Sequence, residues 1–194
     1  RRRAEFMPSQ DMALSVRKIT RQASTRIART AFALAAQRRR KITVVHKANV
    51  FRVSDGLFLE AVRAVRDEFP DFEYEEQIVD AMAALLIRDP AQFDVIVTTN
   101  MYGDILSDEA SEIAGSLGMA ASLNAGEHFA MAQAQHGSAP SLAGQDIANP
   151  SSLIGSAAML LRWIAKRHDA PHFVLAAKAI ESAISTAVAN PRTR

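Results

Sequence analysis

The stretch 94–118 constrains the fold of this chain most strongly, because a short apolar run leads there directly into a helical pattern. The run Val95–Val97 is β-branched and flanked by polar residues, as in a strand buried within an α/β sheet. Asn100 and Gly103 are residue types that favour a turn, and the apolar spacing over 104–114 then predicts a helix. The stretch therefore predicts a strand, a turn and a helix of an α/β fold.

Two aspartates in this predicted helix are candidates for chemistry. Asp104 and Asp108 are four residues apart, which places them on one face of a helix, one turn from each other. Carboxylate oxygens suit a hard cation such as Mg²⁺ or Mn²⁺, and the chain has no Cys for a thiolate site. From the spacing alone two interpretations stay open: a divalent metal site, or a capping aspartate followed by a solvated one.

Composition narrows the class of protein. The 194 residues are 48% hydrophobic and 23% charged, enough for one sizeable core or two small ones. The net charge is only +2, and the basic run 38–41 follows a predicted helix, where the macrodipole favours cations, so we expect no nucleic-acid partner. No apolar run approaches the roughly 20 residues that span a bilayer. We therefore expect no membrane partner and a cytoplasmic location.

Helices and strands alternate along the rest of the chain, which predicts an α/β fold with helices packed on a mixed sheet. Strands are expected at 42–45 and 72–75, and an exposed arm over 1–10 leads into a β-like run at 13–19. Helices are expected at 25–36, 57–69, 77–88, 151–163 and 171–188, with Ser24 and Ser151 or Ser152 as caps. The Gly-, Pro- and Ser-bearing segment 136–150 is predicted to be a ligand-holding loop.

Four segments resemble the isocitrate and isopropylmalate dehydrogenase family, the metal-dependent β-decarboxylating dehydrogenases. They are VVHKANVFRVSDGLFLE, EEQIVDAMAALL, NMYGDILSDEASEIAGSLGM and HGSAPSLAGQDIANP, and the match runs from about Leu14 in the family's order. The resemblance implies oxidation of a 2-hydroxy acid with a β-carboxylate, hydride transfer to NAD or NADP, and loss of carbon dioxide. His46 followed by KAN and DGLF favours isocitrate as substrate, with 3-isopropylmalate, homoisocitrate and tartrate as alternatives.

The resemblance also assigns roles to individual residues. Asp104 and Asp108 would ligate Mg²⁺ or Mn²⁺, joined by Asp80 from the second subunit of a homodimer. Lys47 would help to take the hydroxyl proton, again across the dimer interface, and Asn49 would contact the substrate or the nicotinamide. These assignments predict active sites shared between two subunits.

The resemblance places the coenzyme in the loop 136–149. The expected contacts are His136, Gly137, Ser138, Ala139, Ser141 and Asn149. Ser141 stands where NAD-using members commonly carry Asp and NADP-using members often carry Lys, so NAD is the expected coenzyme and NADP stays open. Gln133 stands where a glutamate is usual, which removes a charge near the nicotinamide.

The same resemblance predicts the domain organisation. Residues 1–121 would form most of a small, dimerising domain with the metal site, and residues 122–194 part of a large coenzyme-binding domain. It also implies that the family's N-terminal part, with its substrate-binding arginines and a tyrosine, is absent from these residues. Two alternatives to an enzyme therefore stay open: a non-catalytic regulatory or interaction subunit, and an inactive truncated fragment.

Overall fold

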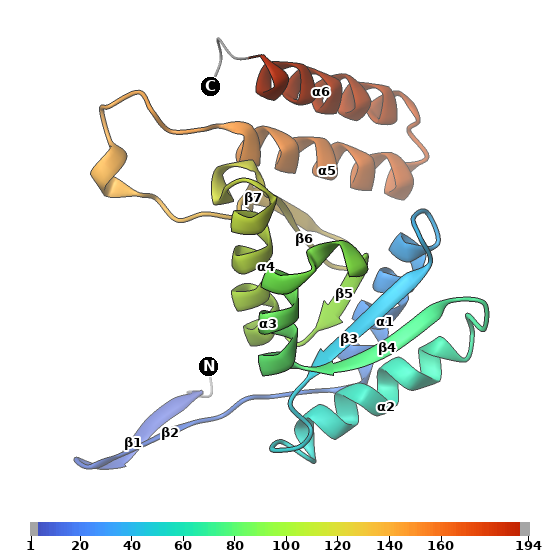
Figure 1. Cartoon of the computed structure of the whole chain (residues 1–194), viewed down its shortest axis with the longest axis vertical. Coiled ribbons are helices and arrows are strands. Elements are labelled where there is room, and N and C mark those ends of the chain that lie inside the picture. The colour runs from blue at the N-terminus through green and yellow to red at the C-terminus, as the bar shows by residue number, and fades with distance from the viewer. Residues whose placement is uncertain (1–3, 191–194) are drawn as a thin grey trace. The chain divides into compact units, whose positions relative to one another are not determined.

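The computed structural model describes residues 4–190 and divides the chain into two compact units, with the division between Ser107 and Asp108. The first unit contains β1 (Glu5–Ser9), β2 (Met12–Ser15), α1 (Arg21–Ala35), β3 (Lys41–His46), α2 (Ser54–Arg66), β4 (Glu73–Ile78), α3 (Val79–Arg88), the 3₁₀ turn η1 (Pro90–Gln92), β5 (Val95–Thr98) and the first half of α4 (Asn100–Ala114) (Figure 1).

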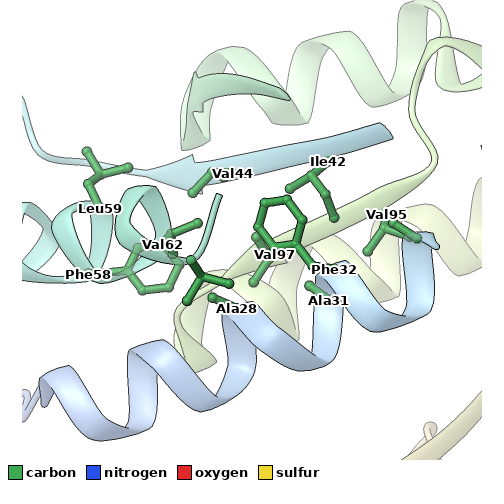
Figure 2. Close-up of a cluster of buried hydrophobic side chains, with 12 residues drawn as sticks. Ala28, Ala31, Phe32, Ile42, Val44, Phe58, Leu59, Val62, Val95 and Val97 are labelled. Carbon is green, nitrogen blue, oxygen red and sulfur yellow. The ribbon is translucent and has the colours of Figure 1, made fainter. Parts of the chain in front are cut away.

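A three-stranded parallel sheet in the order β4-β3-β5 forms the centre of this unit. Side chains alternate along β3, so Ile42 and Val44 face α1 and α2, where they pack with Phe32, Phe58 and Val62 (Figure 2). Val45 faces the other way and packs with Met82, Leu86, Phe93 and Leu106. The sheet is therefore buried on both faces, which explains why its central strand has four consecutive buried residues, Ile42 to Val45, three of them aliphatic.

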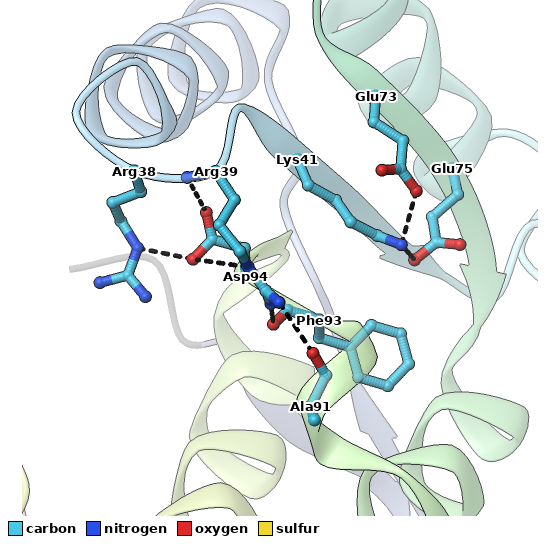
Figure 3. A network of polar contacts seen from close by, with 8 residues as sticks. All are labelled: Arg38, Arg39, Lys41, Glu73, Glu75, Ala91, Phe93 and Asp94. Carbon is cyan, nitrogen blue, oxygen red and sulfur yellow. Dashed lines mark hydrogen bonds and ion pairs between the residues drawn. The ribbon is translucent and has the colours of Figure 1, made fainter.

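An ion network fixes the amino end of the sheet (Figure 3). Arg38 Nε donates to Asp94 at 2.7 Å, the Arg39 backbone N–H donates to the same carboxylate at 3.0 Å, and Lys41 pairs with Glu73 at 2.6 Å. The basic run 38–41 lies beyond the last turn of α1, which contains no basic residue. Acidic side chains, rather than the helix macrodipole, therefore balance its charge.

The second unit contains a hairpin and two long helices: the remainder of α4, η2 (Leu117–Met119), β6 (Ala121–Ala125), β7 (Ala130–Ala134), η3 (Pro140–Leu142), α5 (Ser151–His168) and α6 (His172–Ala189). β6 and β7 pair antiparallel, and α5 packs on both strands and along α6. By length and composition α6 could cross a membrane, but helices of soluble proteins meet the same criterion. Its packing against α5 is that of a helix pair.

The predicted α/β class is confirmed, and the parallel and antiparallel pairings lie in separate sheets among the described residues. The β-like run predicted at 13–19 corresponds to β2, whereas β1 was not predicted; both strands are exposed along their whole length. Residues 1–3 of the predicted arm lie outside the described residues.

Some predicted helix boundaries were wrong. α4 begins at Asn100, so Asn100 and Gly103 lie within the helix and not in a turn. Thr20 caps α1 in place of Ser24, because its Oγ1 accepts the Ala23 N–H at 3.3 Å. Ser24 is instead buried, and its hydroxyl donates to the Thr20 carbonyl at 2.9 Å.

The start of α5 also differs from the prediction. α5 has no side-chain cap, and the buried Ser152 donates its hydroxyl to the Ala120 carbonyl.

In α1, Ile27 and Leu34 are 45% and 49% exposed, and Phe32 fills the core beside three small residues, Ala28, Ala31 and Ala35. Alanines allow α1 to lie close to the sheet, which leaves the larger aliphatic residues at the margin.

Candidate active site

A seven-residue loop, 47–53, follows the carboxyl end of the central strand β3 and carries Lys47 and Asn49. The Lys47 N–H donates to Asp55 Oδ2 at 2.7 Å, and its carbonyl accepts the N–H groups of Val50 at 2.9 Å and Phe51 at 2.8 Å. Both polar groups of the Lys47 backbone are therefore engaged. This holds Lys47 at the edge of a parallel sheet where α/β folds place ligands.

The structure brings together two of the predicted site residues, Lys47 and Asp80. The Lys47 ammonium pairs with the Asp80 carboxylate, which projects from the first turn of α3. This ammonium group lowers the pKa of Asp80, chiefly by donating a hydrogen bond to its carboxylate. The Asp80 side chain is 69% exposed, so water screens the pair and it adds little stability. An exposed, charged pair is instead available to a ligand.

The metal ligands predicted on α4 lie as their spacing requires. α4 is continuous from Asn100 to Ala114, so Asp104 and Asp108 are one turn apart on one face, and both are exposed. Asp108 Oδ1 accepts a hydrogen bond from Gln135 Nε2 at 3.0 Å, and the same amide donates to Ser111 Oγ at 3.1 Å. Asp108 therefore has one oriented carboxylate oxygen and retains lone pairs for a cation.

The donor chemistry fits a hard divalent cation, because Asp80, Asp104 and Asp108 offer only carboxylate oxygens on exposed helix faces. Within residues 4–190 of one chain, no three His, Cys, Asp or Glu side chains converge into a metal-binding group. Asp80 thus pairs with Lys47 and does not complete a site with the α4 aspartates. Its contribution from a second subunit remains a prediction.

The predicted coenzyme loop is exposed at every position from His136 to Asn149. The His136 Nδ1–H donates to the Gly137 carbonyl at 2.8 Å, and Asn149 Oδ1 accepts the Ser151 N–H at 2.9 Å. Ala139 has φ 41°, a left-handed conformation that bends the chain sharply before η3. The loop therefore presents backbone and small side chains openly; its role in coenzyme binding remains a prediction.

Three residues that sequence reasoning did not identify contact the predicted site. Asp55 has no predicted role, yet its side chain is fully buried and accepts the Lys47 N–H. Arg17 donates to Asp55 and to Ser54 Oγ, the latter at 3.1 Å. Gln135 contacts Asp108. Arg17 is 38 residues from Asp55, and Gln135 is 27 residues from Asp108, so no local pattern reveals these contacts. Asp55 is eight residues from Lys47 and lies in the same segment that matches the family, which is the one local signal.

Comparisons with known proteins show the family of this chain. The sequence profile of the isocitrate/isopropylmalate dehydrogenase family matches residues 2–194. The 3-isopropylmalate dehydrogenase of Saccharolobus solfataricus is 48% identical over 180 residues, which are 93% of this chain and 53% of that protein. The homoisocitrate dehydrogenase of Methanocaldococcus jannaschii is 49% identical over 158 residues, 81% of this chain and 45% of that protein.

The crystal structure of isocitrate dehydrogenase from Methylococcus capsulatus superimposes with a TM-score of 0.87 at 41% identity, over 97% of this chain and 55% of that one. The fold predicted from the resemblance, a partial one, is thereby confirmed. The chain spans about half the length of the relatives it matches.

Proposed function

We propose a dehydrogenase function for this chain, which belongs to the isocitrate and isopropylmalate dehydrogenase family. Its protein oxidises and decarboxylates a 2-hydroxy acid bearing a β-carboxylate, with NAD or NADP as the hydride acceptor. The observation that carries the proposal is the coexistence in one chain of the Lys47–Asp80 pair and the aspartate pair of α4. A base and an oxygen-only ligand set are the groups that this chemistry needs.

Each residue has a separate task in the proposed reaction. Asp104, Asp108 and Asp80 would hold Mg²⁺ or Mn²⁺, which when bound acts as a Lewis acid toward the substrate oxygens. Lys47, as the neutral amine, takes the proton of the substrate hydroxyl as the hydride leaves carbon 2, and Asp80 pairs with the ammonium that this transfer forms. The exposed Asn49, two residues along the same loop, contacts the substrate or the nicotinamide.

Isocitrate is the substrate we propose first, because the segment from His46 to Phe58 resembles isocitrate-type enzymes and the superimposed crystal structure is an isocitrate dehydrogenase. The His46 ring accepts the Ala48 N–H on Nδ1 at 3.0 Å and so helps to shape the loop that carries Lys47. 3-Isopropylmalate and homoisocitrate, named in relatives of similar identity, are the alternatives, with tartrate as a fourth compound to test.

The loop 136–149 is the proposed coenzyme site. Ser141 lies in η3, and its carbonyl accepts Gln145 Nε2 at 2.6 Å. Its hydroxyl has no charged partner among residues 4–190. A neutral hydroxyl at this place neither repels a 2′-phosphate nor neutralises it. We therefore propose NAD as the coenzyme and expect only weak discrimination against NADP.

The proposal is tested by changing Asp104 to Asn in the complete protein. We expect coenzyme reduction dependent on Mn²⁺ to fall at least about 100-fold, because a ligand oxygen loses its charge. Glu112→Gln on the same helix is the control: Glu112 is exposed, and the amide oxygen can still accept the Leu117 N–H that Glu112 Oε1 accepts at 3.0 Å. Equal activity of the Asp104→Asn variant and the parent protein would contradict the metal assignment.

A non-catalytic subunit is the second candidate, since Gln133 and Ser141 depart from the family's catalytic pattern. It predicts that the parent protein reduces neither coenzyme with any of the four substrates, yet raises the turnover of a catalytic partner when mixed with it. An inactive fragment would do neither. The substrate panel, run with Mn²⁺ and both coenzymes, first alone and then with a catalytic partner, therefore separates the three possibilities.

A further inference from the structure

Asp55 is a fully buried carboxylate beside the predicted base. It lies in the first turn of α2, and its side chain is 0% exposed. One oxygen, Oδ2, accepts the Lys47 N–H at 2.7 Å, and the other, Oδ1, accepts Arg17 Nη2. A buried carboxylate persists only when both oxygens have such partners, so this one holds two distant segments at fixed places.

Arg17 is itself held on several sides. Its guanidinium donates to Ser54 Oγ at 3.1 Å and lies 4.8 Å from the ring centroid of Phe51 and 5.3 Å from that of Tyr102. Phe51 belongs to the Lys47 loop, and its N–H also donates to the Lys47 carbonyl. Arg17 and Asp55 therefore contact the loop that carries the base at two places, Phe51 and Lys47.

We propose that Asp55, held by Arg17, is a positioning residue that fixes the backbone of Lys47 so that its Nζ reaches Asp80 and the reacting hydroxyl. The inference rests on the proposed function for the identity of the base. Asp55 does not contact the substrate; it acts through the Lys47 N–H. Displacement of a catalytic group by about 1 Å costs on the order of 100-fold in rate, so loss of this anchor reduces turnover.

Asp94 provides a matched control within the same sheet. Its side chain is 2% exposed, and like Asp55 it accepts one arginine side chain, Arg38, and one backbone N–H, that of Arg39 (Figure 3). It precedes β5 at the amino end of the parallel sheet, whereas Lys47 follows β3 at the carboxyl end. Asp94→Asn thus makes the same chemical change in a similar environment away from the base.

The experiment compares Asp55→Asn with Asp94→Asn in the complete protein. For Asp55→Asn we expect amide hydrogen exchange in residues 46–53 to accelerate about tenfold or more in the native state. We expect kcat to fall about 10- to 100-fold while the Kd for Mn²⁺ changes less than about threefold. For Asp94→Asn we expect exchange in that segment and kcat to stay within about twofold of the parent protein, even where its Tm falls.

The inference is overturned if the two variants change exchange and kcat alike, or if Asp55→Asn leaves both unchanged. If Asp55→Asn does not accumulate as folded protein, Arg17→Lys replaces it in the test. This variant weakens the contact between residue 17 and Asp55 but keeps the carboxylate, so amide exchange in residues 46–53 should accelerate less than the tenfold expected for Asp55→Asn. If the parent protein reduces no coenzyme, the proposed function fails, and the exchange comparison alone still decides whether Asp55 holds the loop.

Discussion

The aspartates of this chain differ in what their oxygens already bind. Asp55 and Asp94 are almost completely buried, and each satisfies its carboxylate with an arginine and a backbone N–H. Asp80, Asp104 and Asp108 are exposed and retain free lone pairs. A carboxylate that already holds the fold together has little capacity left for a cation. Burial and hydrogen bonding therefore separate the structural aspartates from the three predicted to be ligands.

The last residue of β3, directly before the Lys47 loop, is a histidine whose pKa is shifted by its surroundings. His46 is partly buried, and this burial is the main cause that lowers its pKa below the ordinary value of 6.5, against the opposing charges of Glu76 and Asp55. Its Nδ1 must be unprotonated to accept the Ala48 N–H. Between the lowered pKa and 6.5 the unfolded chain binds more protons than the folded chain, so the free energy of unfolding falls as pH falls through this window.

His46→Asn should make stability less dependent on pH. The Asn side-chain oxygen can take the place of Nδ1 as acceptor and does not titrate. We expect urea unfolding between pH 5 and 7 to show a smaller loss of stability for the variant than for the parent protein, with little difference between them above pH 7. Parallel curves for the two proteins over the whole range would mean that His46 does not contribute to the pH dependence.

At the scale of the elements, the buried parallel strands were the easiest to predict. Ile42–Val45 within β3 and Val95–Thr98 in β5 are runs of β-branched residues, which are typical of strands buried inside an α/β sheet. β4 was predicted to end at Glu75, with the following helix starting at Gln77; in the structure β4 continues to Ile78, and Glu76 accepts Arg63 at 2.8 and 2.7 Å and the Tyr74 hydroxyl at 2.6 Å. Arg63, which pairs with Glu76 in this strand, lies on α2, so the local sequence around Glu76 does not reveal the pair.

The hairpin β6–β7 was missed for a related reason. Its strands are ASLNA and AMAQA, which contain no β-branched residue and no clear alternation. The buried hydroxyl of Ser156 on α5 accepts the Ser122 N–H at 2.9 Å and donates to the Gln133 carbonyl at 2.8 Å. The hairpin is thus stabilised by a tertiary contact that no local pattern reveals. The predicted ligands, in contrast, came from the family resemblance and not from spacing.

The link between β7 and α4 leads to a prediction about metal affinity. The Gln135 amide follows the end of β7 and donates to Asp108 Oδ1 and Ser111 Oγ, which orients the Asp108 carboxylate. Gln135→Leu removes both bonds at similar volume. We expect the Kd for Mn²⁺, measured without coenzyme from the signal of free Mn²⁺ in electron paramagnetic resonance, to rise about tenfold, as for other residues that orient a metal ligand.

Gln133→Leu is the control for this measurement. Gln133 lies two residues earlier, its side chain is exposed, and its backbone carbonyl keeps its bond to Ser156 in the variant. Its Kd for Mn²⁺ should stay within about twofold of the parent value, because no bond to a predicted ligand is lost. An unchanged Kd for Gln135→Leu would indicate that the amide only links the two elements.

At the scale of the whole molecule, the distribution of charged groups within one chain indicates how two chains would share a site. Lys47 and Asp80 form one set, joined by an ion pair. Asp104 and Asp108 form another on α4, and among the described residues the two sets do not combine into one metal group. If each site takes the first set from one subunit and the second set from the other, a symmetric dimer contains two identical sites.

This arrangement predicts complementation between two inactive variants. When Lys47→Met and Asp104→Asn chains are co-expressed in equal amounts, each heterodimer combines the intact Lys47–Asp80 set of one chain with the intact α4 pair of the other. Random pairing gives heterodimers in half of the molecules with one working site of two, so about a quarter of the parent activity should return. Activity near zero in the mixture would contradict shared sites.

The matched mixture is Lys47→Met with Asp80→Asn, because the structure places these two residues in the same set. Every site in that mixture receives either a chain without the base or a chain without its carboxylate partner, so pairing restores nothing. The two mixtures contain equal numbers of damaged chains, and both need dimers to form; only the division of residues between the sets differs. Recovery in the first mixture and none in the second therefore requires that Lys47 and Asp80 act together, and that they act across the interface on the α4 aspartates of the other subunit.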